Sequence, residues 1–375
     1  MKFCVPSLML GLLSVVFLGA CNRQDKVPSV TVYQQENFPS DLSQWGVIYR
    51  DGDDLVLNDD VIAYDLNSPL FTDYAHKLRT MWIPPGKKIV FEPGPDLQLP
   101  VGSIVSKTFY YPRQGKTLLN TDSQVNDFSS RGLNLNNVQL IETRIMVHLA
   151  DGWHGLPYIW DDAQRRATLA ITGDVKALTL LTGDVSQSFN YVVPDANQCQ
   201  ACHIDNMITE QMHLLGVKVR HLDKSYRGAY NSDNQLAYLL ARNKITALPK
   251  VINKNVNWQD SAQSIEQRAR SYLDINCGHC HNPAGPADTS GMFLNKDEEQ
   301  LIRLGVCKPP VAAGQGTGGR KVGISPGHAD QSILSYRMGS LDLGAMMPEL
   351  GRSLIHTEGV SLVNEWINAM PGDCD

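Results

Sequence analysis

The pattern of hydrophobic and polar positions changes about halfway along the chain. Before residue 190, short apolar runs are bounded by Gly, Pro and Asp turns, as is typical of β-strands; the clearest runs are 88–91, 105–111 and 143–149. After Pro194, apolar residues recur at intervals of three and four, which predicts amphipathic helices at 234–243, 261–275 and 358–370. We therefore predict a multidomain α+β fold, with an N-terminal β-rich, sandwich-like domain followed by two mainly α-helical modules.

The N-terminus has the layout of an export signal. An apolar run from Val5 to Ala20 follows the basic start, and it is shorter than the roughly 20 residues of a membrane-spanning helix. Small residues precede Cys21 directly, so the segment resembles the lipobox of bacterial lipoproteins. The resemblance implies a signal peptide over 1–20, a lipidated Cys21 and a tether over 21–38. An ordinary signal peptide with a chance cysteine is the alternative.

Four of the eight cysteines form two Cys-x-x-Cys pairs, and a histidine follows each pair at once. The two runs are Cys199-Gln-Ala-Cys202-His203 and Cys277-Gly-His-Cys280-His281. Cys-x-x-Cys-His is the attachment motif of c-type haem, because two thiols add to the two vinyl groups of one haem and the adjacent histidine binds the iron. We predict two covalently attached haem c groups, with His203 and His281 as iron ligands.

Two other uses of paired cysteines, a zinc site and a redox pair, fit the sequence less well than haem. A tetrahedral zinc site with four cysteines does not need a histidine directly after both pairs. A thioredoxin-like redox pair would require a βαβ setting, and two copies would be unusual. Cys307 and Cys374 are the remaining pair, and in an oxidising compartment we expect them to form a disulfide rather than two free thiols.

The C-terminal part resembles a known haem domain. Residues 261–372 contain a helix leading into the second motif, a long loop, Met347-Pro348 and a terminal helix, and this order resembles a class I cytochrome c domain. The resemblance implies His281 as the proximal and Met347 as the distal ligand of haem 2, with Met346 or Met338 as substitutes. A methionine ligand raises the reduction potential relative to two histidines.

The wider chain is similar to an uncharacterised family of bacterial dihaem cytochrome c lipoproteins. The stretches that carry this likeness are 67–74, 197–203, 272–283 and 346–352. With it we divide the mature chain into a β-rich domain over 39–190, a cytochrome c-like haem module 1 over 191–258 and a class I cytochrome c-like haem module 2 over 259–375.

For the sixth ligand of haem 1, the sequence offers several candidates. Met207, Met212, His213 and His221 follow the first motif closely. Met207 is disfavoured because it stands only four residues past His203, whereas the ligand has to reach the opposite face of the ring. Our prediction is Met212 or His213; if neither ligates, the iron has an open face.

Composition narrows the remaining classes of function. The 375 residues carry a net charge of −6 and are 42% hydrophobic, which excludes wholesale disorder and argues against a general nucleic-acid binder. The segment Gly314–Gly319 matches G-x-G-x-x-G, but Pro309-Pro310 precedes it where a dinucleotide site needs a strand. We therefore expect neither nucleic acid nor nucleotide as a partner.

Electron transfer is the function that these features predict. No catalytic residue is assigned, and the expected partners are a redox protein, such as a dehydrogenase or another cytochrome, and a membrane through the lipid anchor. Export implies a lipid-anchored protein of a Gram-negative envelope, and Asn22 after the lipidated cysteine favours the periplasmic face of the outer membrane. The alternatives are a dihaem peroxidase or oxidase with an open haem 1 iron, and a subunit whose β-rich domain binds an organic substrate.

Overall fold

The computed structural model describes residues 29–91, 97–121, 127–129, 132–204, 206–226, 234–312 and 314–374. The predicted signal peptide, Cys21 and the first residues of the tether lie outside these ranges. Within these ranges, no helix has the length and hydropathy needed to cross a bilayer.

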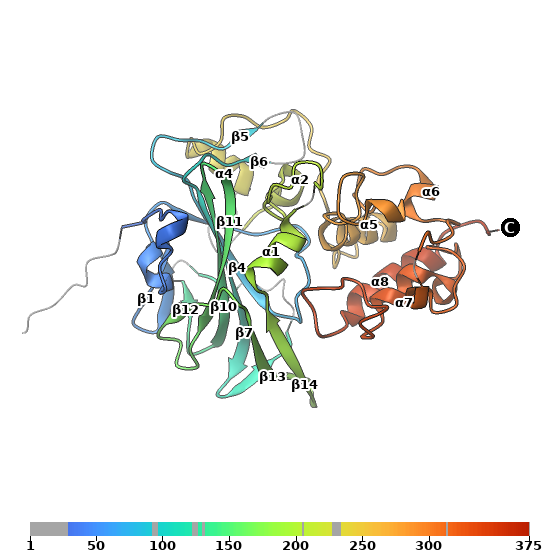
Figure 1. Ribbon diagram of the computed structural model, residues 1–375, viewed down its shortest axis with the longest axis horizontal. Helices are drawn as coiled ribbons and strands as arrows, with labels where there is room; N and C mark the ends of the chain where they lie inside the picture. The colour runs from blue at the N-terminus through green and yellow to red at the C-terminus, as the bar shows by residue number, and fades with distance from the viewer. Residues whose placement is uncertain are drawn as a thin grey trace, which may run out of the picture.

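A large sheet, nine-stranded within the described residues, forms the body of the protein and curls into a half-barrel (Figure 1). Its strands are β3 (Val61–Tyr64), β4 (His76–Trp82), β7 (Ile104–Gln114), β8 (Thr117–Leu119), β10 (Val138–Leu149), β11 (Gly152–Trp160), β12 (Ala167–Leu169), β13 (Asp174–Thr182) and β14 (Val185–Val193). The order is β12-β11-β10-β7-β8-β13-β14, and β4 joins β7 to β3. Pairing is antiparallel except between β8 and β13.

Two smaller sheets and short helices complete the described elements. One sheet combines β1 (Ile48–Asp51), β2 (Asp54–Leu57) and β9 (Leu133–Asn134), and the other pairs β5 (Val90–Phe91) with β6 (Leu97–Gln98). The α-helices are α1 (Ala196–His203), α2 (Val219–Leu222), α4 (Gln235–Ala241), α5 (Ile265–Asn276), α6 (Leu301–Leu304), α7 (Ile333–Met338) and α8 (Thr357–Asn368). The 3₁₀ helices are η1 (Gln35–Asn37), η2 (Leu42–Trp45), η3 (Asp288–Ser290), η4 (Gly314–Thr317) and η5 (Ala329–Gln331).

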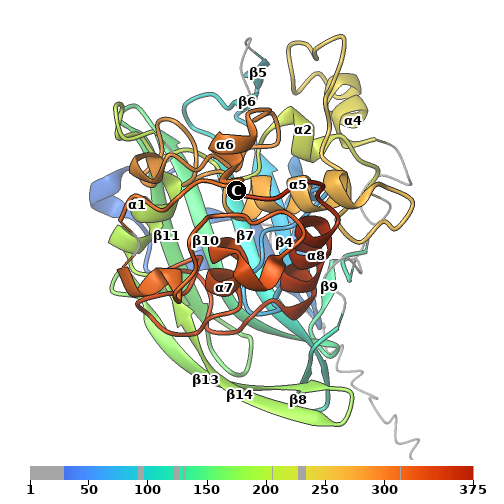
Figure 2. The same ribbon diagram turned by 90° about the vertical axis from the view of Figure 1, so that its right-hand side faces the viewer.

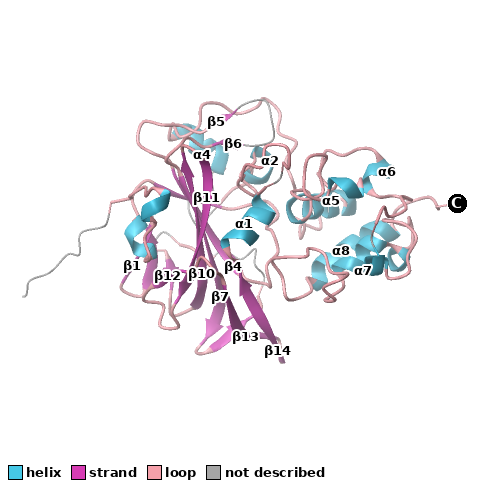
Figure 3. Ribbon diagram, viewed as in Figure 1, coloured by secondary structure: helices cyan, strands magenta, loops and turns pink. Residues whose placement is uncertain are grey.

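Helices α1, α5, α6, α7 and α8 lie on one side of the large sheet, whereas a helical segment beside β1 lies on the other (Figure 3). Turned by 90°, the molecule shows α7 and α8 in front of β4, β7 and β10 (Figure 2). Leu354, just before α8, packs in one cluster with Phe109 and Tyr111 of β7, so this sheet face is an internal surface.

That face carries an unusual row of cations. Arg79, Lys107 and Arg144 stand directly opposite one another on β4, β7 and β10, and cross-strand partners project from the same side of a sheet. We call it the charged face. The other face is apolar, with Leu78, Ile145 and Tyr158 among its buried side chains.

The predicted fold class is wrong in two respects. The β-rich part is a curled half-barrel rather than a sandwich, and the second half does not consist of two mainly helical modules, since the protein is 29% strand and 22% helical. The apolar residues after the first motif do not build a core of their own. Val217, Leu222 and Leu239 belong to the same hydrophobic cluster as the sheet residues. This segment therefore packs on the sheet with short helices and loops, and it does not form a separate helical core.

The three predicted helices are confirmed as elements. They correspond to α4, α5 and α8, with ends shifted by a few residues. Helix α5 begins later than predicted because Ser264 caps it, accepting a hydrogen bond from the Gln267 backbone N–H in a capping box. The runs 105–111 and 143–149 lie in β7 and β10, whereas 88–91 contributes only the two residues of β5.

Candidate haem sites

The first Cys-x-x-Cys-His motif lies on α1, which follows β14 almost at once. Asp195 and Gln198 form a capping box that starts the helix directly after the strand. Helix α1 packs against β11 where that strand has Gly155. A Cβ at this position would lie 3.4 Å from the Cβ of Cys199 and 3.2 Å from the Sδ of Met146. The missing side chain therefore lets the first motif approach the sheet.

His203, the last residue of the first motif, is fixed through one ring nitrogen. Its Nδ1 lies 2.6 Å from the carbonyl oxygen of His213. Among the described residues, its Nε2 has no hydrogen-bond partner. Burial and the nearby Lys107 ammonium lower the pKa of His203 to about 3, so the ring is neutral near pH 7. A neutral imidazole held at Nδ1 offers Nε2 to a metal.

The second motif repeats this arrangement at the end of α5. Cys277 caps the helix, and Gly278 packs so tightly that a Cβ would lie 2.7 Å from the carbonyl oxygen of Asp274. The Nδ1 of His281 lies 3.2 Å from the carbonyl oxygen of Met292. Burial lowers the pKa of His281. Both motif histidines thus donate from Nδ1 to a backbone carbonyl ten or eleven residues further along the chain.

The cysteines of both motifs are outside the disulfide of this chain. Cys199, Cys202, Cys277 and Cys280 form no disulfide. Nowhere in the described ranges do three or more Cys, His, Asp or Glu side chains converge as ligands of one metal ion. The four thiols consequently do not build a tetrahedral zinc centre. Burial raises the pKa of each thiol of the first motif and raises the pKa of Cys277 to about 12, so they are protonated thiols, the form that adds to a vinyl group.

The residues fit haem c on these grounds. Each motif supplies two cysteines outside any disulfide, and each histidine is neutral, oriented through Nδ1 and, within the described residues, open at Nε2. An imidazole that ligates a metal ordinarily donates its other ring N–H to a carbonyl or carboxylate. That pattern occurs twice here, once in each motif.

Met347 lies on a loop that the side chains of Arg352 and Arg337 hold, the latter through the Ala345 carbonyl. The Nη2 of Arg352 donates to the carbonyl oxygens of Ser340 and Met347, at 2.8 and 3.0 Å. The Met347 backbone N–H donates to the Arg337 carbonyl at the end of α7. Arg337 lowers and Glu349 raises the pKa of His281, so this loop and the second motif lie within electrostatic range. Met347 as distal ligand stays a prediction.

The two substitute methionines are more deeply buried than Met347. Met346 is 4% exposed and Met338 is 7% exposed. Met338 packs in the hydrophobic cluster of the C-terminal part, together with α5 and α8 residues. That packing favours a core role for Met338.

Met212 and His213 lie on the same side of His203 as its Nδ1. The backbones of His203 and His213 are also joined, by a hydrogen bond of 2.8 Å from the His213 N–H. The Cε of Met212 approaches β11 at Gly155. Met212 or His213 as sixth ligand of haem 1 stays a prediction.

The charged face lies beside the first motif. Arg79 pairs with Asp65 and Arg144 with Glu142, whereas Lys107 has no ion pair or hydrogen bond within the described residues. Burial, with Arg79 and Arg144 nearby, lowers the pKa of Lys107 to about 7. Sequence reasoning missed Lys107, although a lysine inside the apolar run of β7 was a visible signal.

The fold brings the two motifs together. The Met207 N–H, just after the first motif, donates to the Ala284 carbonyl, just after the second, at 2.7 Å. His279 of the second motif acts on the pKa of His203, and Lys107 acts on the pKa of both rings. The two attachment sites are therefore neighbours, although 78 residues separate Cys199 from Cys277 in the sequence (277 − 199).

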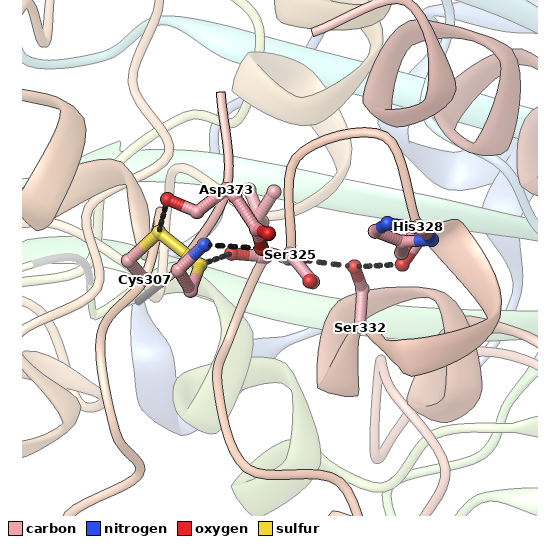
Figure 4. The surroundings of a disulfide bond; sticks show 7 residues. Cys307, Ser325, His328, Ser332 and Asp373 are labelled. Atoms are coloured by element: carbon pink, nitrogen blue, oxygen red, sulfur yellow. Dashed lines mark hydrogen bonds between the residues drawn. A yellow bond between two sulfur atoms is a disulfide. The ribbon is translucent and has the colours of Figure 1, made fainter. Parts of the chain in front are cut away.

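Cys307 and Cys374 form a disulfide that ties the C-terminal segment to the loop after α6 (Figure 4). Ser332 connects two points of the neighbouring segment, because its Oγ accepts a hydrogen bond from the Ser325 N–H and donates one to the His328 carbonyl (Figure 4). The segment that matches G-x-G-x-x-G forms η4 rather than a strand-to-helix turn. The disulfide and these hydrogen bonds therefore cross-link loops of the C-terminal part of the chain.

No family model, curated protein or solved structure matches this chain. The chemistry of the sites accordingly rests on the residues and their geometry.

Proposed function

We propose that the protein is an extracytoplasmic dihaem c-type cytochrome that passes electrons between redox partners. The observation that carries the proposal is the repeated arrangement of His203 and His281. Each ring donates from Nδ1 to a backbone carbonyl and leaves Nε2 without a partner within the described residues, in a motif with two cysteines outside any disulfide.

The chain's own residues build each site. The S–H of each motif cysteine adds across one vinyl group, so the sulfur bonds to one carbon, the hydrogen goes to the other and no oxidant is consumed. The histidine after each pair provides Nε2 to the iron. When bound, haem iron supplies reversible one-electron chemistry between its ferrous and ferric states.

The neighbouring positions of the motifs suit a relay. The Met207–Ala284 hydrogen bond and the coupling of His279 to His203 put the two sites side by side within one chain. An electron accepted from a reducing protein partner at one site can then pass to the other and on to an oxidising partner. No proton or atom has to move with it.

Export belongs to the same proposal. Haem c is attached outside the cytoplasm, and the predicted signal peptide and lipidated Cys21 would deliver the chain there. Cleavage before Cys21 and acylation of that residue are checked by mass spectrometry of the mature N-terminus.

Haem stoichiometry tests the proposal. We expect two haems per chain after expression with a c-type maturation system, measured as the pyridine haemochrome. Replacing Cys199 and Cys202 together by Ala should leave one covalent haem, and so should replacing Cys277 and Cys280. Replacing Cys307 and Cys374 by Ala is the matched control and should leave two. A purified, folded wild-type chain without covalent haem would refute the proposal.

A further inference from the structure

His279, the variable residue of the second motif, is a buried histidine that the proposed function has not used. Its Nδ1 is buried and makes no hydrogen bond of acceptable geometry, although the Ile275 carbonyl acts on its pKa. Its Nε2 has no partner among the described residues either. Buried polar side chains are ordinarily satisfied, so one that is not calls for an explanation such as a missing ligand.

The position of His279 supplies that explanation. It precedes Cys280, in the loop whose Ala284 carbonyl accepts the hydrogen bond from Met207 of the first motif. Among the groups that act on the pKa of His203 is His279 itself. His279 therefore lies within electrostatic range of His203, in a loop that the Met207–Ala284 hydrogen bond joins to the first motif, whereas the His213 carbonyl holds Nδ1 of His203.

We propose that His279 is the sixth ligand of the haem 1 iron. The inference rests on the proposed function, and it makes haem 1 a bis-histidine site completed by module 2. Its chemistry is that of a neutral imidazole, which is a strong iron ligand and lowers the reduction potential relative to methionine. It also links the two attachment motifs through one iron, so haem 1 would be complete only in the docked arrangement of both parts.

The experiment uses the full-length protein with both haems. Near-infrared magnetic circular dichroism of the oxidised protein separates His/His from His/Met and His/Lys ligation. We expect one His/His haem in the wild type and no carbon monoxide adduct on it after reduction. In His279→Leu, we expect the His/His signal to disappear and carbon monoxide to bind one haem in two. In His279→Met, we expect a His/Met signal in its place and a higher potential of haem 1.

Two control variants sharpen the result. His213→Leu should keep the His/His signal, because only the backbone of His213 holds His203. Lys107→Met should also keep it, because the lysine is the other unpaired group near His203 within the described residues.

A wild-type protein without a His/His haem overturns the inference even if the variants fail to fold. Loss of the His/His signal in Lys107→Met or His213→Leu, with retention in His279→Leu, overturns it too. In these cases two haems per chain are still counted, whereas a protein without haem defeats the proposed function itself.

Discussion

At the scale of single residues, the Met347 loop depends on arginine side chains for its position. The Met347 loop has no regular structure, and its position depends on Arg352, which donates to the carbonyls of Ser340 and Met347. A guanidinium can reach several carbonyls at once because its donors form a fixed fork. Arg352 is thus a positioning residue for Met347.

Replacing Arg352 by Gln should free the Met347 loop. We expect the long-wavelength methionine–iron absorption band of the oxidised protein to weaken or vanish, and reduced haem 2 to become accessible to carbon monoxide. The visible spectrum before and after carbon monoxide measures both effects. Arg320→Gln is the matched control, because Arg320 also donates to backbone carbonyls in module 2 but not to that loop. An unchanged band in Arg352→Gln would show that Arg352 does not position Met347.

At the scale of elements, the first motif depends on the contact between α1 and β11. Gly155 leaves a gap in β11 that Cys199, Met146 and Met212 fill. Interiors are close-packed, so an added side chain forces these groups apart. The helix that carries the thiols therefore owes its position to the absence of one side chain on a neighbouring strand.

Gly155→Val tests this contact. Valine suits a strand, so the effect comes from packing, and we expect a loss of about 1–3 kcal/mol in the free energy of unfolding. Haem attachment at the first motif should fall while the second keeps its haem, as peptide mass mapping would measure. Ser186→Val on the exposed part of β14 is the control and should change neither quantity. Equal haem occupancy at both motifs in Gly155→Val would contradict the argument.

At the scale of the whole molecule, the segment 67–74 connects the large sheet with the second half of the chain through hydrogen bonds. Asn67 donates to the Arg220 carbonyl, Ser68 to the Val256 carbonyl, and the Phe71 N–H to Asn276 of α5. Asp73 accepts from the backbone N–H groups of Ser353 and Leu354, both at 2.7 Å. Through the bonds to Asn276, Ser353 and Leu354, this segment connects the sheet with the C-terminal part of the chain.

The joint has a built-in pH dependence. Burial raises the pKa of Asp73 to about 6, against an ordinary value of 3.8, even though the two N–H bonds oppose the shift. The folded protein then binds more protons than the unfolded chain between about pH 4 and pH 6, so the stability falls as the pH rises through this window. A shift of this size corresponds to up to about 3 kcal/mol.

Asp73→Asn should abolish that fall. The amide oxygen still accepts both N–H bonds and no buried charge forms, so we expect the variant to be more stable than the wild type at pH 7 by about 1–3 kcal/mol. Urea denaturation at a series of pH values measures the difference. Asp162→Asn, at an exposed position, should keep the wild-type slope. A slope in Asp73→Asn equal to that of the wild type would assign the pH dependence elsewhere.

Prediction from the sequence succeeded where the signal is local. The helices α4, α5 and α8 follow from periodicity, and the Cys307–Cys374 disulfide follows from the cysteines left over by the two motifs. The haem chemistry of the two motifs stays a prediction. Prediction from the sequence failed on the fold class, because periodicity shows that a segment is amphipathic without showing what covers its apolar face. Val217, Leu222 and Leu239 could equally have packed on one another, and they pack on the sheet instead.

The sequence by itself determined the two Cys-x-x-Cys-His motifs, because their cysteines and histidines are contiguous in the chain and need no distant partner to be recognised. Only the tertiary structure decided what surrounds them. It tied Nδ1 of His203 to His213, and it placed Lys107, Arg144 and His279 within electrostatic range of that ring. These relations join positions far apart in the chain, and such contacts depend on how strands pair and which faces are buried, which no local pattern records.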